Sequence, residues 1–493
     1  MNIINVPKKK GVIKMTNNQK RIGAFALAFM LSVPSFPFAT ANGEETQALI
    51  SPTIEYNFSY DTPGSATGTI TMSHLHSEDT LYLYWGDGKD NILKKGNIEY
   101  SAITSVAPKT TTAKYTFNSN YAAIPQGAAQ ILLKDSTGKI ITTTFIPGNK
   151  TQNYGTLKYE YALMSDVHYN RYPKESSALP ENEDYSVTAF NNALSFISNA
   201  SVNTVFLTGD LSNQGELDAY NKFNKAISKY PDMTVYTCMG NHDVSWTKSS
   251  TEMVKQFTKN INTKKNKDKN VTDIAQNNLD FVYKKDNDYF VFLSQTKAVY
   301  SKNATLLADE QLNWLEKILN KYADKQVFIL FHTYFANNDG NIENAVGNLI
   351  NPGGYTYDLT YSFGAKDEVR FRKLLNKYNY VTLYSGHSHW AQDQVKYNYS
   401  LMIDNINSST SGATLFHIPS VSAPRTIEEN ATKRDENAGD RSEGIIASRY
   451  DGCIVYTGVD FKNGKYLGYS VYSCNDGKTS TPIPEIKVGK AKI

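Results

Sequence analysis

The chain has 493 residues, of which 40% are hydrophobic and 20% are charged, and its formal net charge is +3. This length is enough for about two to four domains of roughly 100–200 residues each. The first 41 residues hold six Lys or Arg and no Asp or Glu, so the rest of the chain carries a formal charge of −3. Because a nucleic-acid binder usually shows a basic stripe, we expect no binding to a nucleic-acid duplex.

The N-terminal segment has the layout of a secretory signal peptide. A basic stretch from residue 8 to 21 precedes an apolar run at residues 22–33, and Ala39-Thr40-Ala41 follows. Basic, apolar and small residues in this order are typical of a cleaved signal. The apolar run is about 12 residues, shorter than the roughly 20 of a membrane-spanning helix. We expect residues 1–41 to be a signal peptide and the protein to be secreted or cell-surface, without an integral membrane span; a retained anchor is the alternative.

The three cysteines are too few to be the main staple of a secreted protein. Cys238 lies in a strand-like run and is expected to be buried. Cys453 and Cys474 lie in two strand-like runs joined by Asn463-Gly464, a strong signal for a two-residue hairpin turn. That turn would place the two cysteines opposite each other, so a disulfide between them is a hypothesis, which one β-bulge would break.

Residues 42–150 are predicted to form an all-β domain. Short runs rich in Thr, Tyr, Ile and Val alternate with turn residues such as Asp87-Gly88 and Thr137-Gly138. Closely spaced strands of this kind favour a β-sandwich, here of the immunoglobulin or fibronectin type. Contact with the cell surface is one role considered for it. Residues 147–153 are interpreted as a linker to the next domain.

From residue 156 to about 485, apolar strand-like runs alternate with segments of helical periodicity. Alternation of this kind favours an α/β layered domain. In open α/β sheets, ligands gather outside the carboxyl ends of the strands. Those strand ends carry polar residues: Asp166 and His168 in "SDVH", Asp210 in "TGD", Asn241, His242 and Asp243 in "MGNHD", His332 in "FH", and His387 and His389 in "SGHSH".

Each of these short motifs taken alone has a structural explanation. His332 alone would more often be a core histidine, and His74-Leu75-His76 has the same spacing as the last motif but is interpreted as structural. His417 is interpreted as a packed residue near the site. Residues two apart on an extended segment project the same way, so Asp166 with His168, and His387 with His389, can each form a claw. The whole set, at successive strand ends of one domain, is what indicates a metal site.

Seven of these residues divide into two metal-binding groups that share one carboxylate. The first group is Asp166, His168, Asp210 and His389, and the second is Asp210, Asn241, His332 and His387. Mixed imidazole and oxygen ligands without thiolate suit two divalent ions of Fe, Mn or Zn. Such a pair can activate a bridging hydroxide for attack on a phosphate ester, which predicts a small-molecule phosphoester as substrate.

The ordered series D-x-H, G-D-x-x-x-x-G, G-N-H-D, H and G-H-x-H resembles the calcineurin-like metallophosphoesterase superfamily over roughly residues 156–475. The resemblance implies a four-layer α/β/β/α sandwich with a two-metal centre held by the seven residues above. It also implies that His242 is catalytic, acting on the leaving oxygen. Asp243 would then orient His242 through a hydrogen bond.

Details of the motifs bear on the branch of the superfamily. The chain resembles purple acid phosphatases in its N-terminal β segment, but Asn213 stands where they carry a tyrosine ligand, and they lack the first-motif histidine. The D-x-H form is more similar to class III cyclic-nucleotide phosphodiesterases, so we expect a phosphodiesterase. A phosphomonoesterase and a non-catalytic cell-surface binding protein are the alternatives. The aromatic-rich segment 333–363 and Trp390 are candidates for substrate contact or for packing.

Overall fold

We describe a computed structural model of the chain. It describes residues 51–473 apart from 63–64, 118–123, 126, 147–155, 172–184, 245–247, 298–305, 334–369, 372, 376, 379, 392–402, 406–412, 428–433 and 437–440. The predicted signal peptide, the predicted linker, most of segment 333–363 and Cys474 therefore lie outside the described residues. Among the residues described, no helix combines the length and the apolar character needed to cross a bilayer.

The described residues before 147 form strands, as the sequence predicts. A three-stranded sheet has the order β1-β2-β7, a four-stranded sheet the order β6-β3-β8-β9, and β4 pairs with β5. Their bounds are Thr53–Thr62 (β1), Ser65–Ser73 (β2), Leu81–Gly86 (β3), Lys94–Lys95 (β4), Ile98–Glu99 (β5), Thr104–Val106 (β6), Thr112–Phe117 (β7), Gln130–Lys134 (β8) and Ile140–Phe145 (β9). One hydrophobic cluster draws on both larger sheets, through Ile70 and Met72 on one side and Leu83 and Ile131 on the other. The β-sandwich assignment and its boundaries stay a prediction that this shared core supports.

A six-stranded sheet carries the first three metal-ligand motifs. Its order is β12-β11-β10-β22-β23-β24, with β10, β11 and β12 parallel and the last three strands antiparallel. The bounds are Leu157–Met164 (β10), Thr204–Leu207 (β11), Thr234–Thr237 (β12), Glu443–Tyr450 (β22), Cys453–Asp460 (β23) and Lys465–Ser473 (β24). All four residues of β11 are buried, as expected for a central parallel strand covered on both faces.

A seven-stranded sheet carries the remaining motifs. Its order is β13-β14-β15-β16-β17-β19-β18, and β15, β16, β17 and β19 run parallel. The bounds are Val271–Ile274 (β13), Phe281–Lys285 (β14), Asp288–Phe292 (β15), Val327–Leu330 (β16), Val381–Ser385 (β17), Ile403–Asn405 (β18) and Thr414–His417 (β19). A short ladder pairs β20 (Arg425–Ile427) with β21 (Arg434–Glu436).

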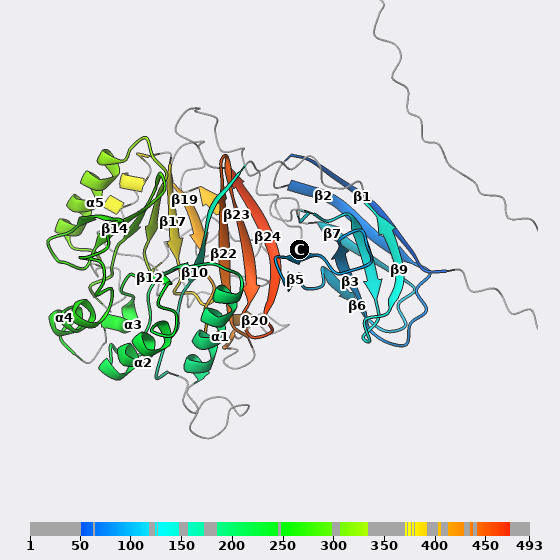
Figure 1. Cartoon of the computed structure of the whole chain (residues 1–493), viewed down its shortest axis with the longest axis horizontal. Coiled ribbons are helices and arrows are strands. Elements are labelled where there is room, and N and C mark those ends of the chain that lie inside the picture. Colours follow the sequence, from blue (N-terminus) through cyan, green and yellow to red (C-terminus); the bar gives the residue numbers. More distant parts are fainter. Residues whose placement is uncertain are drawn as a thin grey trace, which may run out of the picture. The chain divides into compact units, whose positions relative to one another are not determined.

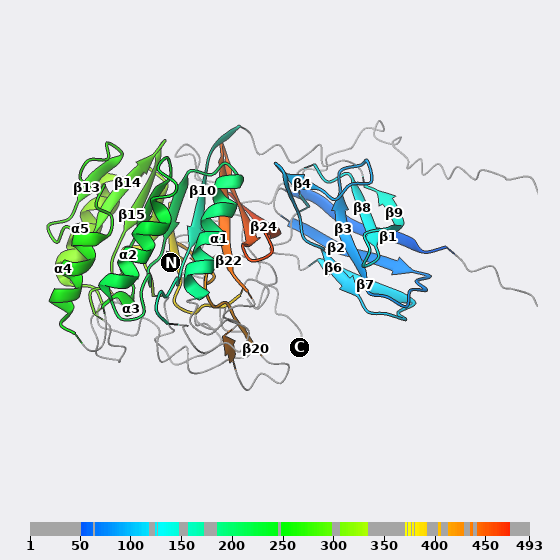
Figure 2. The same ribbon diagram turned by 60° about the horizontal axis from the view of Figure 1, so that its bottom comes forward.

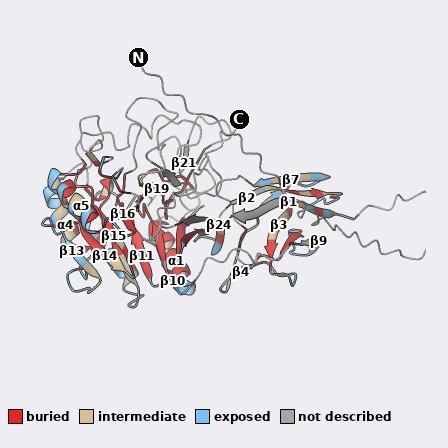
Figure 3. Cartoon of the chain, turned by 90° about the horizontal axis from the view of Figure 1, so that it is seen from above, coloured by how far each residue is buried: buried red, intermediate tan, exposed pale blue. Residues whose placement is uncertain are grey.

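The two large sheets pack face to face, and helices cover their outer faces (Figure 1, Figure 2). Aromatic residues of both sheets, including Tyr161, Phe206, Phe328 and Tyr384, form the cluster between them. The outer face of the six-stranded sheet packs against α1 (Tyr185–Asn199), α2 (Leu217–Ile227) and α4 (Ser250–Asn260). The outer face of the seven-stranded sheet packs against α5 (Asp309–Lys321). Figure 3 shows the buried residues concentrated in these strands, so the mixed α/β architecture is as predicted.

The register of the C-terminal hairpin differs from the prediction. Asp460 pairs with Lys465, so residues 461–464 form a longer loop than the assumed two-residue turn, and Asn463 bonds back to the Asp460 side chain. A bulge between Thr457 and Val459 shifts the register again. Cys453 therefore lies opposite Ser473, not Cys474, and is a free thiol whose pKa burial raises to about 11. Cys238 is buried and free, as expected.

Candidate metal centre

The predicted ligands converge at one edge of the two sheets. Asp166 and His168 follow β10, Asp210 follows β11, and Asn241 opens α3 (Asn241–Val244) after β12. From the other sheet, His332 follows β16, and His387 and His389 follow β17. The backbone holds the segments together, because Asp166 N–H donates to the Gly209 carbonyl and Gly386 N–H donates to the His332 carbonyl. Six of the seven predicted ligands are buried, and His387 is half-buried.

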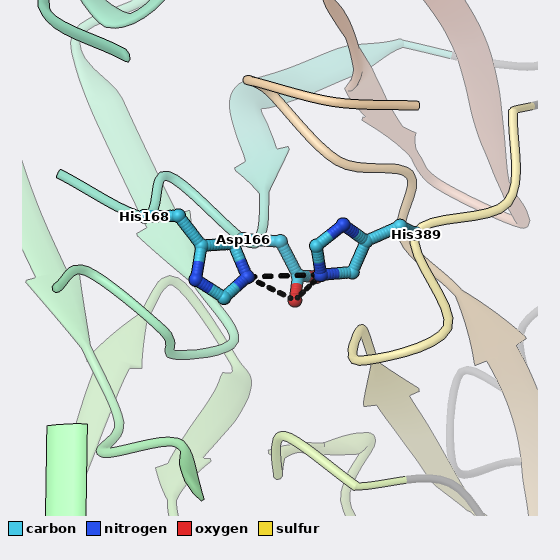
Figure 4. A group of neighbouring side chains, drawn as sticks. All are labelled: Asp166, His168 and His389. Carbon is cyan, nitrogen blue, oxygen red and sulfur yellow. Dashed lines mark hydrogen bonds and ion pairs between the residues drawn. The ribbon is translucent and has the colours of Figure 1, made fainter. Parts of the chain in front are cut away.

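The first group has the spacing of ligands that share one ion, and Figure 4 shows three of its members, Asp166, His168 and His389. His389 Nε2 lies 3.0 Å from Asp166 Oδ1 and 2.9 Å from His168 Nε2, and His168 Nε2 lies 3.5 Å from Asp166 Oδ1. His168 Nε2 also lies 3.6 Å from Asp210 Oδ2. Donor atoms bound to one ion at about 2.0–2.2 Å lie about 2.8–3.6 Å from each other in octahedral or tetrahedral geometry. All four distances fall in that range.

The second group shares Asp210 with the first. His332 Nε2 lies 3.0 Å from Asp210 Oδ2, the same oxygen that faces His168. Ligand atoms of Asp210, His332 and His387 all lie within 4.8 Å of one another. The position of Asp210 Oδ2 between both groups is what a carboxylate that bridges two ions requires.

Several ligand atoms are buried without a hydrogen bond. They are Asp166 Oδ1, Asp210 Oδ2, Asn241 Oδ1, His332 Nε2 and His389 Nδ1. A buried polar atom without a partner costs about 1–3 kcal/mol, and more when it is charged. Three of these atoms, Asp166 Oδ1, Asp210 Oδ2 and His332 Nε2, face other members of the two groups described above. A fourth atom belongs to Asn241, which is also a predicted ligand. The residues present therefore fit two divalent cations, which would satisfy these atoms.

Hydrogen bonds on the far side of each ligand fix its orientation. Asp166 Oδ2 accepts from the His387 backbone N–H at 3.0 Å, and Asp210 Oδ1 accepts from the His242 backbone N–H at 2.9 Å. His332 Nδ1 donates to the Thr208 carbonyl, also at 2.9 Å. These three residues thus each use one polar atom for the protein and turn the other toward the site, the arrangement that orients metal ligands in general.

The backbone at the ligands is in a conformation that most side chains avoid. The backbone angle φ lies between 51° and 69° at five of the predicted ligands, namely Asp166, His168, Asp210, His387 and His389. The left-handed region costs roughly 1–2 kcal/mol for a residue with a Cβ, although Asp and Asn tolerate it better than most. These sharp bends aim neighbouring ligands into the site, and the surrounding hydrogen bonds hold them there.

His242 and Asp243 are close to the site, but the predicted hydrogen bond between them is wrong. His242 Nδ1 lies 2.9 Å from the Asn213 carbonyl oxygen, to which it donates. The Asp243 carboxylate accepts instead from the N–H groups of Leu211, Ser212 and Gly240 and from the Ser212 hydroxyl. The two residues are consecutive in α3, and consecutive side chains on a helix point in different directions. Asp243 therefore fixes the loops that carry Asp210 and Asn241.

The remaining sequence candidates are structural where the structure describes them. Trp390 is fully buried and packs in the cluster under α5. His417 is buried, and its Nε2 donates to the Trp390 carbonyl at 3.1 Å. His74 and His76 are exposed and belong to none of the metal-type clusters found among the described residues.

Electrostatics distinguish the histidines. Burial works against a charged His332, but the carboxylates of Asp210 and Asp166 outweigh it and raise the pKa of His332 to about 9. Burial lowers the pKa of His389 to about 4, despite the neighbouring Asp166. Burial, together with Asp210, raises the pKa of Asp243 to about 7. In the metal-free protein near neutral pH, His332 therefore carries the proton that partly balances the two carboxylates.

Two arginines near the centre were not predicted from the sequence. Arg171 Nη1 lies 3.1 Å from His242 Nε2, and buried Arg425 donates to the Ser388 carbonyl at 2.9 Å. Arg171 follows His168 by three residues, but that spacing alone does not show which way a loop side chain points. The backbones of Arg425 and Trp390 form an isolated parallel β-bridge. This contact between residues distant in sequence places Arg425 near the site.

Comparisons with known proteins agree with this geometry. Residues 160–391 match the sequence model of the calcineurin-like phosphoesterase family. The family consists of metal-dependent phosphoester hydrolases, and the ligand clusters lie within the matched range or at its edge. Residues 160–391 are therefore a calcineurin-like phosphoesterase domain. With the Asp and His clusters, this match indicates a binuclear divalent-metal site.

Solved structures give a more distant likeness. A dimetal phosphatase from Danio rerio is 13% identical, with a TM-score of 0.41, and the match covers 65% of this chain and 100% of that one. A purple acid phosphatase from yellow lupin, Lupinus luteus, is also 13% identical with a TM-score of 0.41, and the match covers 86% of this chain and 74% of that one. No curated protein sequence matches the chain.

Replacing Gly386 by alanine is expected to reduce metal binding. A Cβ at this position would lie 1.8 Å from Ser165 Oγ and 2.6 Å from Asp166 Oδ2, so the first-group carboxylate would have to move. Gly452→Ala is the matched control, because its Cβ would meet no atom within 4 Å. Elemental analysis of the purified proteins should show less metal per chain for Gly386→Ala than for Gly452→Ala. Equal metal content with unchanged thermal stability would contradict the geometry.

Metal uptake by the metal-free protein is expected to release a proton from His332. A ligand must be deprotonated to bind a metal, and the raised pKa of about 9 keeps His332 protonated at pH 7. The apparent metal affinity should therefore rise about tenfold per pH unit from this residue below pH 9 and level off above it. Calorimetric titrations at pH 7 in buffers of different ionisation enthalpy measure the protons released. A value near zero would show that His332 is neutral or is not a ligand.

Proposed function

We propose that the protein is a secreted two-metal phosphoesterase that prefers phosphodiesters. The observation that carries the proposal is the convergence of buried ligand atoms, several of them lacking hydrogen bonds, with His242 beside His168 and Asp210. The family match supports the reaction class, and the D-x-H first motif supports the diester preference. Asp166, His168, Asp210, Asn241, His332, His387 and His389 are proposed as the metal ligands.

The metals and the chain contribute different parts of the chemistry. Two divalent ions would activate a water molecule and offset negative charge on the phosphoryl group. The ligands are already oriented by their outer hydrogen bonds, so little reorganisation accompanies binding.

His242 is proposed as the residue that exchanges a proton with the leaving oxygen. Its Nδ1 donates to the Asn213 carbonyl, and its ring meets His168 edge-on at a centroid distance of 4.5 Å, so Nε2, which lies 3.1 Å from Arg171 Nη1, is the ring nitrogen proposed to act. To donate a proton from Nε2, the ring must be doubly protonated. Burial and the neighbouring His168 and Arg171 lower the pKa of His242. A bound phosphate anion would counter that effect, which ties proton donation to substrate binding.

A phosphomonoesterase is the second candidate. The observation in its favour is Arg171, whose positive charge lies beside His242 and favours a doubly charged phosphate. A non-catalytic binding protein is less well supported, because a binder has no need of a histidine beside the ions. Secretion, and contact with the cell surface through the N-terminal strands, stay predictions based on the sequence.

His242→Ala is expected to retain metal and to lose most of its turnover. Removing a general acid costs about 100- to 10,000-fold in rate, whereas the seven proposed ligands are untouched. The measurements are elemental analysis and hydrolysis of a phosphoester panel. His76→Ala, which replaces an exposed histidine, is the control. Loss of metal from His242→Ala would make His242 a ligand, in line with its position near His168 and Asp210. A metal-loaded wild-type protein that hydrolyses no member of the panel would favour the binding protein.

The diester preference predicts a particular activity ratio. The wild-type protein should have a higher kcat/KM on bis(p-nitrophenyl) phosphate than on p-nitrophenyl phosphate. The two substrates share a leaving group, so the ratio reports how the site receives a singly or a doubly charged phosphate. Dominant turnover of the monoester would reverse the order of the two candidates.

A further inference from the structure

We propose that Arg171 binds a non-bridging oxygen of the substrate phosphoryl group and favours doubly charged monoesters relative to diesters. This inference rests on the proposed phosphoesterase function and deepens it by assigning a substrate-binding residue. The inference holds whichever ester the enzyme hydrolyses faster, because it concerns how the charge of Arg171 changes the ratio of monoester to diester activity.

A tight turn places the Arg171 guanidinium at the ligand cluster. Arg171 N–H donates to the His168 carbonyl at 3.1 Å, and Asn170 between them has φ of 70°. The Asn170 side chain is in turn held by Lys222 of α2. The turn follows directly from the D-x-H motif, so Arg171 is anchored to the same backbone as His168.

The guanidinium lies against the rings that face the substrate position. Arg171 Nη1 lies 3.1 Å from His242 Nε2 and 3.4 Å from His168 Nε2. The first of these atoms is the proposed proton donor, and the second is a proposed ligand atom 2.9 Å from His389 Nε2. A group within reach of both atoms is also within reach of a phosphoryl group that spans them.

Electrostatics argue that this position serves an anion. The two carboxylates, Asp166 and Asp210, supply about two negative charges, and two divalent ions would supply four positive ones. Arg171 adds a further positive charge beside His168 and His242. Arginine also presents planar N–H donors that match phosphate oxygens. Arg171 is half-buried, so water screens its charge less than at a fully exposed position.

The same charge discriminates between esters. A phosphomonoester carries two negative charges above its second ionisation near pH 6, whereas a phosphodiester carries one. Coulomb attraction scales with the product of the charges, so Arg171 stabilises a bound monoester more than a diester. Its removal should therefore impair monoester hydrolysis more strongly.

The test compares Arg171→Gln and Arg171→Lys with the wild-type metal-loaded protein. Arg370→Gln is the matched control, because Arg370 pairs with Asp309 at the start of α5. We expect Arg171→Gln to keep its metal and to lose about ten- to a hundredfold in kcat/KM on p-nitrophenyl phosphate, as for a lost charge-assisted hydrogen bond, with a smaller loss on bis(p-nitrophenyl) phosphate. Inorganic phosphate, titrated by calorimetry, should bind more weakly by a similar factor. Arg171→Lys should recover part of both, and Arg370→Gln should match the wild type.

The outcomes separate this inference from the proposed function. Equal losses on both esters, unchanged phosphate affinity, or loss of metal from both Arg171 variants would overturn the role of Arg171. If the wild type hydrolyses neither ester but Arg171→Gln still weakens phosphate binding, the proposed function fails and the phosphate contact stands. If the wild type is active and Arg171→Gln behaves like Arg370→Gln, the inference fails and the proposed function stands.

Discussion

The two buried carboxylates, Asp166 and Asp210, are the constraint on which the centre depends. Each gives one oxygen to a backbone N–H and leaves the other without a hydrogen bond. The N–H that holds Asp166 comes from His387 after β17, so a residue of the six-stranded sheet is fixed by the seven-stranded sheet. Asp210 in turn faces His332, which follows β16. The site therefore exists only where the edges of the two sheets are held in register with each other.

The aromatic layer between the sheets supplies that register. Phe328 of β16 stacks on Phe290 at 4.8 Å and on Tyr384 at 5.5 Å, and Tyr384 shares a hydroxyl hydrogen bond with Tyr161 of β10 at 2.8 Å. Tyr161 and Tyr384 lie on the two strands that lead to Asp166 and His387. A close-packed interior resists sliding, because a displaced ring loses contacts on every side. Packing several residues away from the ligands thus determines whether their atoms meet at bonding distance.

The sequence predicts which polar residues come together because they obey a simple topological rule. Parallel strands end at the same edge, so polar residues just after apolar runs must meet there. The errors have a different origin. The family resemblance implies that Asp243 orients His242, whereas the Asp243 carboxylate bonds to Leu211, Ser212 and Gly240 instead. The hairpin register was assigned from Asn463-Gly464, whereas side-chain bonding at Asp460 and a bulge near Thr457 changed it. Arg171 was missed because a turn of Asn170 into the left-handed region decides its direction, and no periodicity marks such a turn.

The left-handed backbone at five ligands has a consequence for how the centre is assembled. Each bend costs free energy in the folded chain, and so does each buried ligand atom without a hydrogen bond. Contacts among the ligands do not offset these two costs. Their oxygen and nitrogen atoms lie close together, and two such atoms repel each other unless a proton lies between them. His332 can hold one such proton, which offsets only part of the charge of Asp166 and Asp210. The geometry is therefore shaped for cations, and the hydrogen bonds and packing of the surrounding sheets keep it in place until they bind.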